Sequence, residues 1–187
     1  MGCSIAGMSS PTVLVLLAEG FEEIEFVAPL DLLRRAGADV TVAALGDGIH
    51  VTGRSGVILH ADTSLSAVSG DFDCILLPGG PGVARLRADA RVAELVKKQA
   101  GAGGWIAAIC AAPTVLLDAG VLGNRRYTAH FSVAPELPSA LLSERVVVDG
   151  RLITSRGAGT AIDFGLAVVE RLFSPQRAAE IAKSVSA

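Results

Sequence analysis

Short apolar runs alternate with helical patterns along this chain, and this alternation constrains the fold more than any other feature of the sequence. Continuous apolar runs that end in acidic or glycine-rich turns are typical of strands buried on both faces of a sheet. The segments between these runs space their apolar residues as an amphipathic helix does. Strands separated by helices predict a mostly parallel sheet with helices on both faces.

The predicted elements follow from these patterns and from the glycines and prolines that end them. The predicted strands span residues 12–18, 39–45, 73–77 and 105–109, and the predicted helices span 22–36, 89–99, 112–119, 160–173 and 175–185. Two hairpins are predicted as well, one within 49–60 and one that joins 145–148 to 152–154 through Asp149-Gly150.

The composition of the 187 residues supports one globular domain. Hydrophobic residues make up 51% of the chain and charged residues 19%, so an intrinsically disordered chain is excluded. The formal net charge is −3, which gives no basic field for a nucleic acid, so none is expected as a partner. We predict a flexible leader over residues 1–11 and a single domain over 12–187.

The uncharged and cysteine-containing segments bear on the cellular compartment. The longest uncharged stretch, 99–117, is rich in alanine and glycine and contains Pro113, so we expect no membrane span. No secretory signal is visible at the start of the chain. The three cysteines, Cys3, Cys74 and Cys110, are odd in number and lack metal-type spacing. We therefore expect no metal and no disulfide framework, and a reducing, cytoplasmic compartment.

The first four residues, MGCS, resemble an acylation signal, with Gly2 for myristate and Cys3 for palmitate. Ala6 stands where such a signal carries a hydroxyl residue. We favour an ordinary tail over an acylated anchor at this position.

Cys110 is the first candidate for a chemical role. It lies between the predicted strand 105–109 and the helix after it, and small neighbours, Ala111 and Ala112, leave room for a substrate. A residue in such a turn is often strained and exposed, and a helix N-terminus favours the thiolate. A free cysteine is equally often buried and inert, so position alone leaves both interpretations open, whereas Cys74 lies inside an apolar strand and is read as core.

Two further strand ends carry unusual residues. Gly79 and Gly80 follow the strand 73–77 and could present backbone N–H groups to a developing oxyanion, although paired glycines are also common in plain turns. After the first strand, Glu25 lies between apolar residues and is the acid expected to face inward, where a carboxyl tends to stay protonated. Glu22 and Glu23 are read as solvated acids at a helix N-terminus.

His130 follows Tyr127-Thr128-Ala129 and could move protons near neutral pH. A lone histidine is more often structural, so both interpretations stay open. His50 and His60 lie in the first predicted hairpin and are expected at the surface or at an interface.

Several segments together resemble the ThiJ/PfpI superfamily, and within it the Parkinson-disease protein 7 (parkinsonism-associated deglycase) branch. The matching segments are VLVLLAEGFEEIEFVAPLDLLRRAGADVTVA, DCILLPGG, AAICAAPTVLL, YTAH and LITSRGAGTAIDFGLAVVE. They span nearly the whole chain from Val13 to about Lys183. The resemblance implies a flavodoxin-like three-layer α/β sandwich, related to class I glutamine amidotransferases, and a homodimer.

The resemblance also implies roles for individual residues. Cys110 matches the reactive nucleophile, Glu25 the protonated glutamate that hydrogen-bonds it, and His130 the histidine beside the thiol. Gly79 and Gly80 match the glycines of the oxyanion pocket. Protease-like relatives carry a histidine directly after the nucleophile, and this chain carries Ala111 there, which argues against a peptidase. His60 or a neighbour replaces the family's second oxidisable cysteine.

The function implied by the resemblance is cofactor-independent chemistry on methylglyoxal and related α-oxoaldehydes, as in the glutathione-independent glyoxalases and protein deglycases of this branch. One alternative is a non-enzymatic redox sensor or chaperone whose signal is oxidation of the Cys110 thiol, with a role in oxidative-stress protection. A weaker alternative is a cysteine peptidase.

Overall fold

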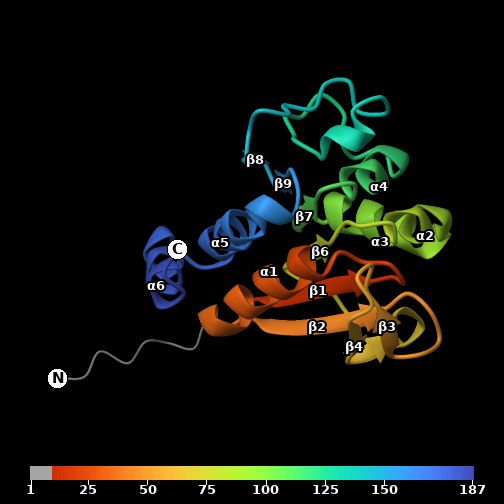
Figure 1. Ribbon diagram of the computed structural model, residues 1–187, viewed down its shortest axis with the longest axis horizontal. Helices are drawn as coiled ribbons and strands as arrows, with labels where there is room; N and C mark the ends of the chain where they lie inside the picture. Colours follow the sequence, from red (N-terminus) through yellow and green to blue (C-terminus); the bar gives the residue numbers. More distant parts are fainter. Residues whose placement is uncertain (1–9) are drawn as a thin grey trace.

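A seven-stranded sheet forms the centre of the protein in a computed structural model that describes residues 10–187 (Figure 1). Its strands lie in the order β5 (Thr63–Ser64), β2 (Asp39–Ala44), β1 (Thr12–Leu17), β6 (Cys74–Leu77), β7 (Trp105–Ile109), β9 (Leu152–Ser155) and β8 (Val146–Asp149). Neighbouring strands run parallel except β8, which pairs antiparallel with β9. The prediction of a mostly parallel sheet is confirmed.

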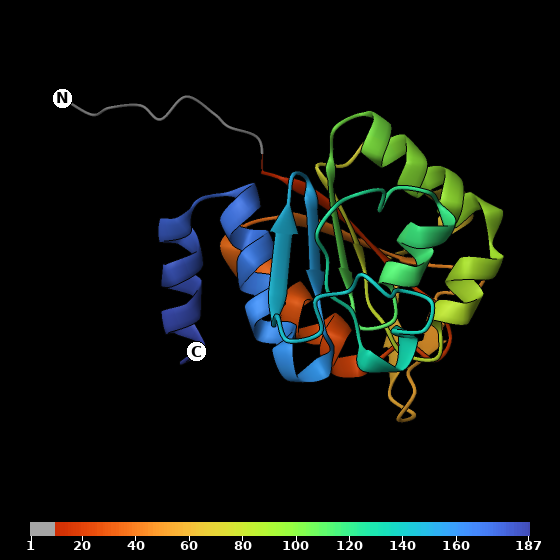
Figure 2. The same cartoon turned by 90° about the horizontal axis from the view of Figure 1, so that it is seen from above.

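Helices cover both faces of this sheet, as Figure 2 shows. One face packs against α1 (Glu23–Ala36) and α5 (Ala161–Leu172), and α6 (Pro175–Ser184) packs beside them. The other face packs against α2 (Val83–Ala88), α3 (Ala90–Gly101) and α4 (Pro113–Asp118). The result is the three-layer α/β sandwich that the sequence predicts.

The position of β1 inside the sheet explains why its sequence is apolar from Val13 to Leu17. Its side chains alternate between the two layers of core, with Val13 and Val15 packed among residues of α1 and α5, and Leu14 and Leu16 packed among residues of α3 and α4. All four side chains are fully buried. A strand with helices on both faces has no solvent-facing side, so the polar alternation of a one-sided sheet is absent.

The structure adds elements that the sequence did not predict. The helix α2, the strand β5 and three short 3₁₀ segments are each six residues long or fewer, too short for a periodic pattern to be recognised. The 3₁₀ segments are η1 (Leu65–Ala67), η2 (Phe131–Val133) and η3 (Ala158–Thr160). The predicted hairpin within 49–60 is present as β3 (His50–Thr52) and β4 (Ile58–His60), a separate two-stranded sheet.

None of the helices within residues 10–187 has both the length and the apolar character needed to cross a lipid bilayer. The acylation signal considered for Gly2 and Cys3 lies outside the described residues.

Candidate functional site

The candidate residues meet at one rim of the sheet because the parallel strands end there together. The carboxyl ends of β1, β6, β7 and β9 lead into four loops, and open α/β sheets bind their ligands at this edge. Glu25 follows the first loop, Gly79 and Gly80 lie in the second, and Cys110 lies in the third. The three strand ends that carry unusual residues in the sequence therefore meet at one rim of the sheet.

Cys110 occupies a strained turn directly after β7. Its φ angle is 65°, in the left-handed region that residues with a side chain rarely adopt. Two backbone hydrogen bonds hold this conformation: the Cys110 N–H donates to the Ser155 carbonyl at 2.9 Å, and the Cys110 carbonyl accepts from the His130 N–H at 2.8 Å. The turn at Cys110, called the elbow below, is therefore strained as expected. Hydrogen bonds with β9 and with the His130 loop support it.

Glu25 points from the first turn of α1 to the elbow and is only 1% exposed. Its Oε2 accepts a hydrogen bond from the Gly79 N–H at 2.9 Å, and its carboxyl also contacts the Ala158 backbone N–H. The same carboxyl lies next to the Cys110 thiol and interacts with it. This acid thus faces inward, as its apolar neighbours in the sequence predict.

Gly79 and Gly80 allow the β6 loop to approach the elbow closely. A Cβ atom on Gly79 would lie 2.6 Å from the Cys110 Cβ and 2.5 Å from the Glu25 Oε2, so no side chain fits there. The Gly79 N–H is occupied by Glu25 and is not free for an oxyanion, which corrects the sequence-based assignment of that group. The N–H groups that face the Cys110 sulfur belong to Gly80 and Ala111.

Glu25 and Cys110 form a coupled pair. Burial, together with the charge of Glu22, raises the pKa of Glu25 to about 7, against the hydrogen bonds from Cys110 and the backbone. Burial and the adjacent Glu25 carboxylate raise the pKa of Cys110 to about 12, against the N–H groups of Gly80 and Ala111. The expectation of a lowered thiol pKa from a helix N-terminus is wrong, because burial outweighs these two N–H groups. Between pH 7 and pH 12 the pair therefore holds one proton.

His130 lies next to the elbow, where its backbone N–H donates to the Cys110 carbonyl. Its Nδ1 lies 2.8 Å from the Ser132 Oγ and accepts the Ser132 N–H at 3.3 Å, so hydrogen bonding assigns the proton of the neutral ring to Nε2. The ring also packs against Phe131, with ring centroids 4.1 Å apart.

Gly157 marks the point where the three candidate side chains converge, and no pattern in the sequence singled out this residue. A Cβ atom on Gly157 would lie 3.3 Å from the His130 Cδ2, 3.6 Å from the Glu25 Oε1 and 4.0 Å from the Cys110 Sγ. The Thr160 hydroxyl donates to the Gly157 carbonyl at 2.8 Å and fixes the loop. The sequence feature that could have pointed to Gly157 is the pair of glycines in the segment SRGAGT.

The other acids and histidines lie outside this cluster. Glu23 accepts the Ser55 N–H at 2.8 Å and Glu22 pairs with Arg54 at 3.1 Å, so both acids hold the β3–β4 hairpin and are not simply solvated. His50 and His60 are exposed and face each other across that hairpin, with ring centroids 4.5 Å apart. Their predicted surface position is confirmed.

Cys74 lies in β6 with no exposed surface, which confirms its assignment to the core. Among residues 10–187, no group of three or more His, Cys, Asp and Glu side chains is close enough to hold a metal ion.

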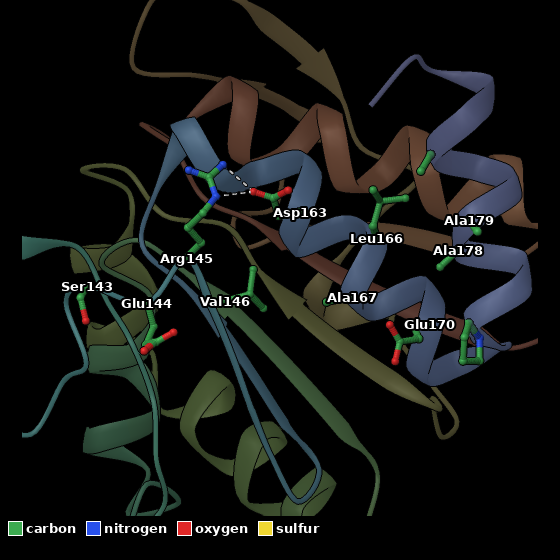
Figure 3. Close-up of a pocket in the computed structure, with 12 residues that line it drawn as sticks. Ser143, Glu144, Arg145, Val146, Asp163, Leu166, Ala167, Glu170, Ala178 and Ala179 are labelled. Atoms are coloured by element: carbon green, nitrogen blue, oxygen red, sulfur yellow. Dashed lines mark hydrogen bonds and ion pairs between the residues drawn. The ribbon is translucent and has the colours of Figure 1, made fainter.

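A wide groove of about 770 Å³ lies away from the elbow, between β8, α5 and α6 (Figure 3). Its walls include Arg145, which pairs with Asp163, and the small side chains of Ala178 and Ala179. Neither Cys110, Glu25 nor His130 lines it. We assign this groove no part in the chemistry of the site.

The fold and the site together define a class of α/β proteins with a cysteine elbow, in which a buried carboxyl contacts the thiol at the carboxyl edge of a parallel sheet. The chain belongs to the DJ-1/PfpI family, whose family model matches residues 11–171. This result confirms the resemblance that the sequence motifs indicated.

Individual relatives extend this similarity over almost the entire chain. The Drosophila melanogaster protein dj-1beta is 44% identical over 94% of this chain and 97% of its own length. The Caenorhabditis elegans protein named glutathione-independent glyoxalase DJR-1.2 is 37% identical over 91% of this chain and 93% of its own length. The structure of oxidized Toxoplasma gondii DJ-1 superposes with a TM-score of 0.90 at 38% identity, over 94% of this chain and 98% of that one.

Proposed function

We propose that the protein is a cofactor-independent enzyme that converts methylglyoxal and related α-oxoaldehydes to 2-hydroxy acids without glutathione. The observation that supports this most is the contact between Cys110 and a buried Glu25 whose pKa of about 7 suits proton transfer at neutral pH. The name of the C. elegans relative agrees with this activity.

The first step forms a bond between the Cys110 sulfur and the aldehyde carbon. The single proton of the coupled pair passes from the Cys110 thiol to the Glu25 carboxylate, and moves on to the aldehyde oxygen as the thiolate attacks, which gives a hemithioacetal. The N–H groups of Gly80 and Ala111, which face the sulfur, stabilise the charge that develops on this oxygen. Glu25 is left as a carboxylate.

The next steps use that carboxylate as the base. Glu25 removes the proton from the carbon that bears sulfur, and the electron pair forms an enediol with the adjacent carbonyl carbon. The His130 Nε2–H gives its proton to the second oxygen, which completes the enediol. Glu25 then returns its proton to the second carbon, while the oxygen on the first carbon gives its proton back to the His130 Nε2 and becomes the carbonyl of a thioester. Water hydrolyses this thioester to the 2-hydroxy acid and free Cys110. The sum is one α-oxoaldehyde plus one water to one 2-hydroxy acid.

Glu25 suits the role of base better than His130. The His130 Nδ1 already accepts a hydrogen bond from Ser132, and its Nε2 carries the proton, so the resting ring offers a donor. Glu25 alternates between acid and base without leaving contact with the thiol. Protein deglycase action would follow the same route from a methylglyoxal adduct of an amine.

Lactate production from methylglyoxal tests the proposal. The wild-type protein should form lactate in the absence of glutathione and of added metal, and Cys110→Ala should not. For deglycase action, the assay repeats with a preformed amine adduct while a scavenger removes free methylglyoxal. Wild-type turnover by Cys110→Ala would refute nucleophilic catalysis.

A second candidate function is a redox sensor in oxidative-stress protection, favoured by the donors around the Cys110 sulfur. Glu25, Gly80 and Ala111 could hold the oxygens of a sulfinate there. Peroxide treatment followed by mass spectrometry should then modify Cys110 before Cys74, in a stoichiometric reaction without turnover. A peptidase has less support, because the partners of the sulfur are Glu25 and backbone N–H groups.

We also propose a homodimer in the cytoplasm. Exposed apolar side chains occur on two elements: Ile24 and Val27 on α1, and Val57 and Ile58 on the β3–β4 hairpin. A hydrogen bond from the Ser55 N–H to the Glu23 carboxylate connects these two elements. Such a surface fits a twofold interface, and free thiols fit a reducing compartment. Sedimentation should give about twice the monomer mass for the wild type and the monomer mass for Ile58→Glu.

A further inference from the structure

A cavity of about 490 Å³ lies beside the elbow and is distinct from the groove of Figure 3. His130 and Gly157 form the wall nearest the elbow, Phe131 and Leu142 contribute exposed apolar surface, and Arg145 and Arg156 contribute positive charge. The proposed catalytic steps use neither arginine.

Gly157 connects this cavity to the thiol. A Cβ atom on this residue would lie 3.3 Å from the His130 Cδ2 and 4.0 Å from the Cys110 Sγ, between the ring and the sulfur. Because glycine has no side chain, a ligand held at Cys110 can extend past His130 into the cavity.

The two arginines differ in what balances their charge. The Arg145 Nε donates to the Asp163 Oδ2 at 2.8 Å, so its charge is neutralised within the protein (Figure 3). The Arg156 Nη1 meets only the backbone carbonyls of Leu142 and Ser143, both at 3.4 Å. Arg156 forms no ion pair with any acidic side chain of residues 10–187. The wall of this cavity therefore carries one positive charge, that of Arg156, that pairs with no acidic side chain of the described residues.

We propose that Arg156 and this cavity form a carboxylate subsite, and that the preferred substrates are α-oxoaldehydes that carry a carboxylate a few carbons from the reacting carbonyl. A guanidinium matches a carboxylate in charge and in its two-pronged geometry. The exposed faces of Phe131 and Leu142 suit the intervening methylene groups. This inference rests on the proposed function for its substrate class but not for its anion-binding step.

The first test measures the charge at the thiol without turnover. Iodoacetate and iodoacetamide alkylate a thiolate by the same displacement of iodide, but only iodoacetate is an anion. The ratio of their rates at Cys110, iodoacetate over iodoacetamide, should fall about threefold to tenfold in Arg156→Gln, because this variant removes one positive charge that attracts the anionic reagent. Arg156→Lys keeps the charge and should retain most of the wild-type ratio.

Arg151→Gln is the matched control, because it also removes one positive charge. Arg151 lies over the Trp105 ring, 4.8 Å from its centroid, at the opposite end of β7 from Cys110. The alkylation ratio of this variant should equal that of the wild type. An equal fall in Arg151→Gln and Arg156→Gln would overturn the proposal, because the effect would then come from net charge alone.

The second test compares two α-oxoaldehydes of the same chain length, 4,5-dioxopentanoate and the uncharged 2-oxopentanal. Hydration and rearrangement of the first gives 2-hydroxypentanedioate. The ratio of kcat/KM, charged over uncharged, should fall about threefold to tenfold in Arg156→Gln, mainly through KM, and should not change in Arg151→Gln. An unchanged ratio in Arg156→Gln would overturn the preference for carboxylates. An Arg156-dependent alkylation ratio in a protein that turns over neither compound would uphold the anion subsite and refute the proposed function instead.

Discussion

Cys74 and Cys110 lie on neighbouring strands of the same sheet, yet their surroundings differ at every point that matters for chemistry. Cys74 begins β6, is fully buried, and has its pKa raised by burial and by Asp73. Cys110 follows the end of β7, in a strained turn that an ionisable carboxyl contacts. Burial raises the pKa of both thiols, so burial alone does not distinguish a reactive cysteine from an inert one.

The two thiols differ in whether a nearby group can accept their proton. The Cys110 proton can pass to Glu25, and two backbone N–H groups remain to stabilise the thiolate. Cys74 has only the neighbouring Ile75 carbonyl, at 3.6 Å, as a hydrogen-bond acceptor. The carboxyl ends of parallel strands provide loops that can supply such partners, whereas a position within a strand, such as that of Cys74 at the start of β6, does not.

The largest contrast should come from removing each sulfur in turn. We expect Cys110→Ala to lower the rate of lactate formation by more than about 1,000-fold while the unfolding midpoint stays near that of the wild type. Cys74→Ala should keep the activity but lose about 1 kcal/mol of stability, because it leaves a small cavity in a packed core. Steady-state kinetics and urea unfolding measure the two effects, and loss of activity in both variants would contradict the contrast.

Glu25 should account for most of what makes Cys110 different. Glu25→Gln removes the transferable proton, and we expect kcat/KM for methylglyoxal to fall about 100-fold to 10,000-fold. Glu25→Leu should lose a similar amount and also about 1–3 kcal/mol of stability, because the Gly79 N–H is then buried without an acceptor. A Glu25→Gln variant with wild-type turnover would transfer the role of base to His130.

The stability of the protein should depend on pH through Glu25 but not through Cys74. Burial raises the pKa of Glu25 in the folded state from 4.5 to about 7, so the folded protein retains this proton where the unfolded chain has lost it. The stabilisation is fully present below pH 4.5 and is lost as the pH rises through 7.

The wild type should therefore lose roughly 3 kcal/mol relative to Glu25→Gln between pH 4.5 and pH 7.5. Cys74→Ala is the control, because that thiol is protonated in both states over this range and the difference from wild type should stay constant. Urea unfolding at the two pH values measures both differences, and parallel curves for the wild type and Glu25→Gln would exclude a raised Glu25 pKa.

The smallest expected effect concerns the reactivity of the two thiols. The coupled pair loses its first proton near pH 7, and the proton that remains can reside on Glu25 and leave a thiolate. Alkylation of Cys110 by iodoacetamide should rise about tenfold between pH 6 and pH 8, and Glu25→Gln should lack this step. Peptide mass spectrometry should find Cys74 unmodified throughout, and a step that persists in Glu25→Gln would assign the titration to another group.

Much of the site could be predicted because its residues lie in the segments that follow the ends of the strands. The apolar runs locate β1, β6 and β7, and the residues after them, Glu25, Gly79 and Cys110, meet because parallel strands end at one edge. The inward direction of Glu25 followed from its apolar neighbours.

The rest depends on contacts between segments far apart in the chain. Side chains from separate loops determine which acceptor binds the Gly79 N–H. They also determine how strongly burial disfavours the Cys110 thiolate. Gly157 lies 47 residues after Cys110 in the sequence and beside it in space. No local pattern records such distances, so the role of Gly157 and the direction of the Cys110 pKa could not be predicted.

The two outer strands of the sheet also determine how copies of this protein can associate. The strand β5 has only two residues, and β8 runs against the direction of the other strands and returns through a tight turn at Gly150. Unpaired strand edges are where sheets add further strands and grow into fibrils, and edge strands of two and four residues, as in β5 and β8, give little template for such growth. Association of two copies through α1 and the β3–β4 hairpin would instead give a closed twofold dimer. In such a dimer the sheet of one copy would not continue into the sheet of the other.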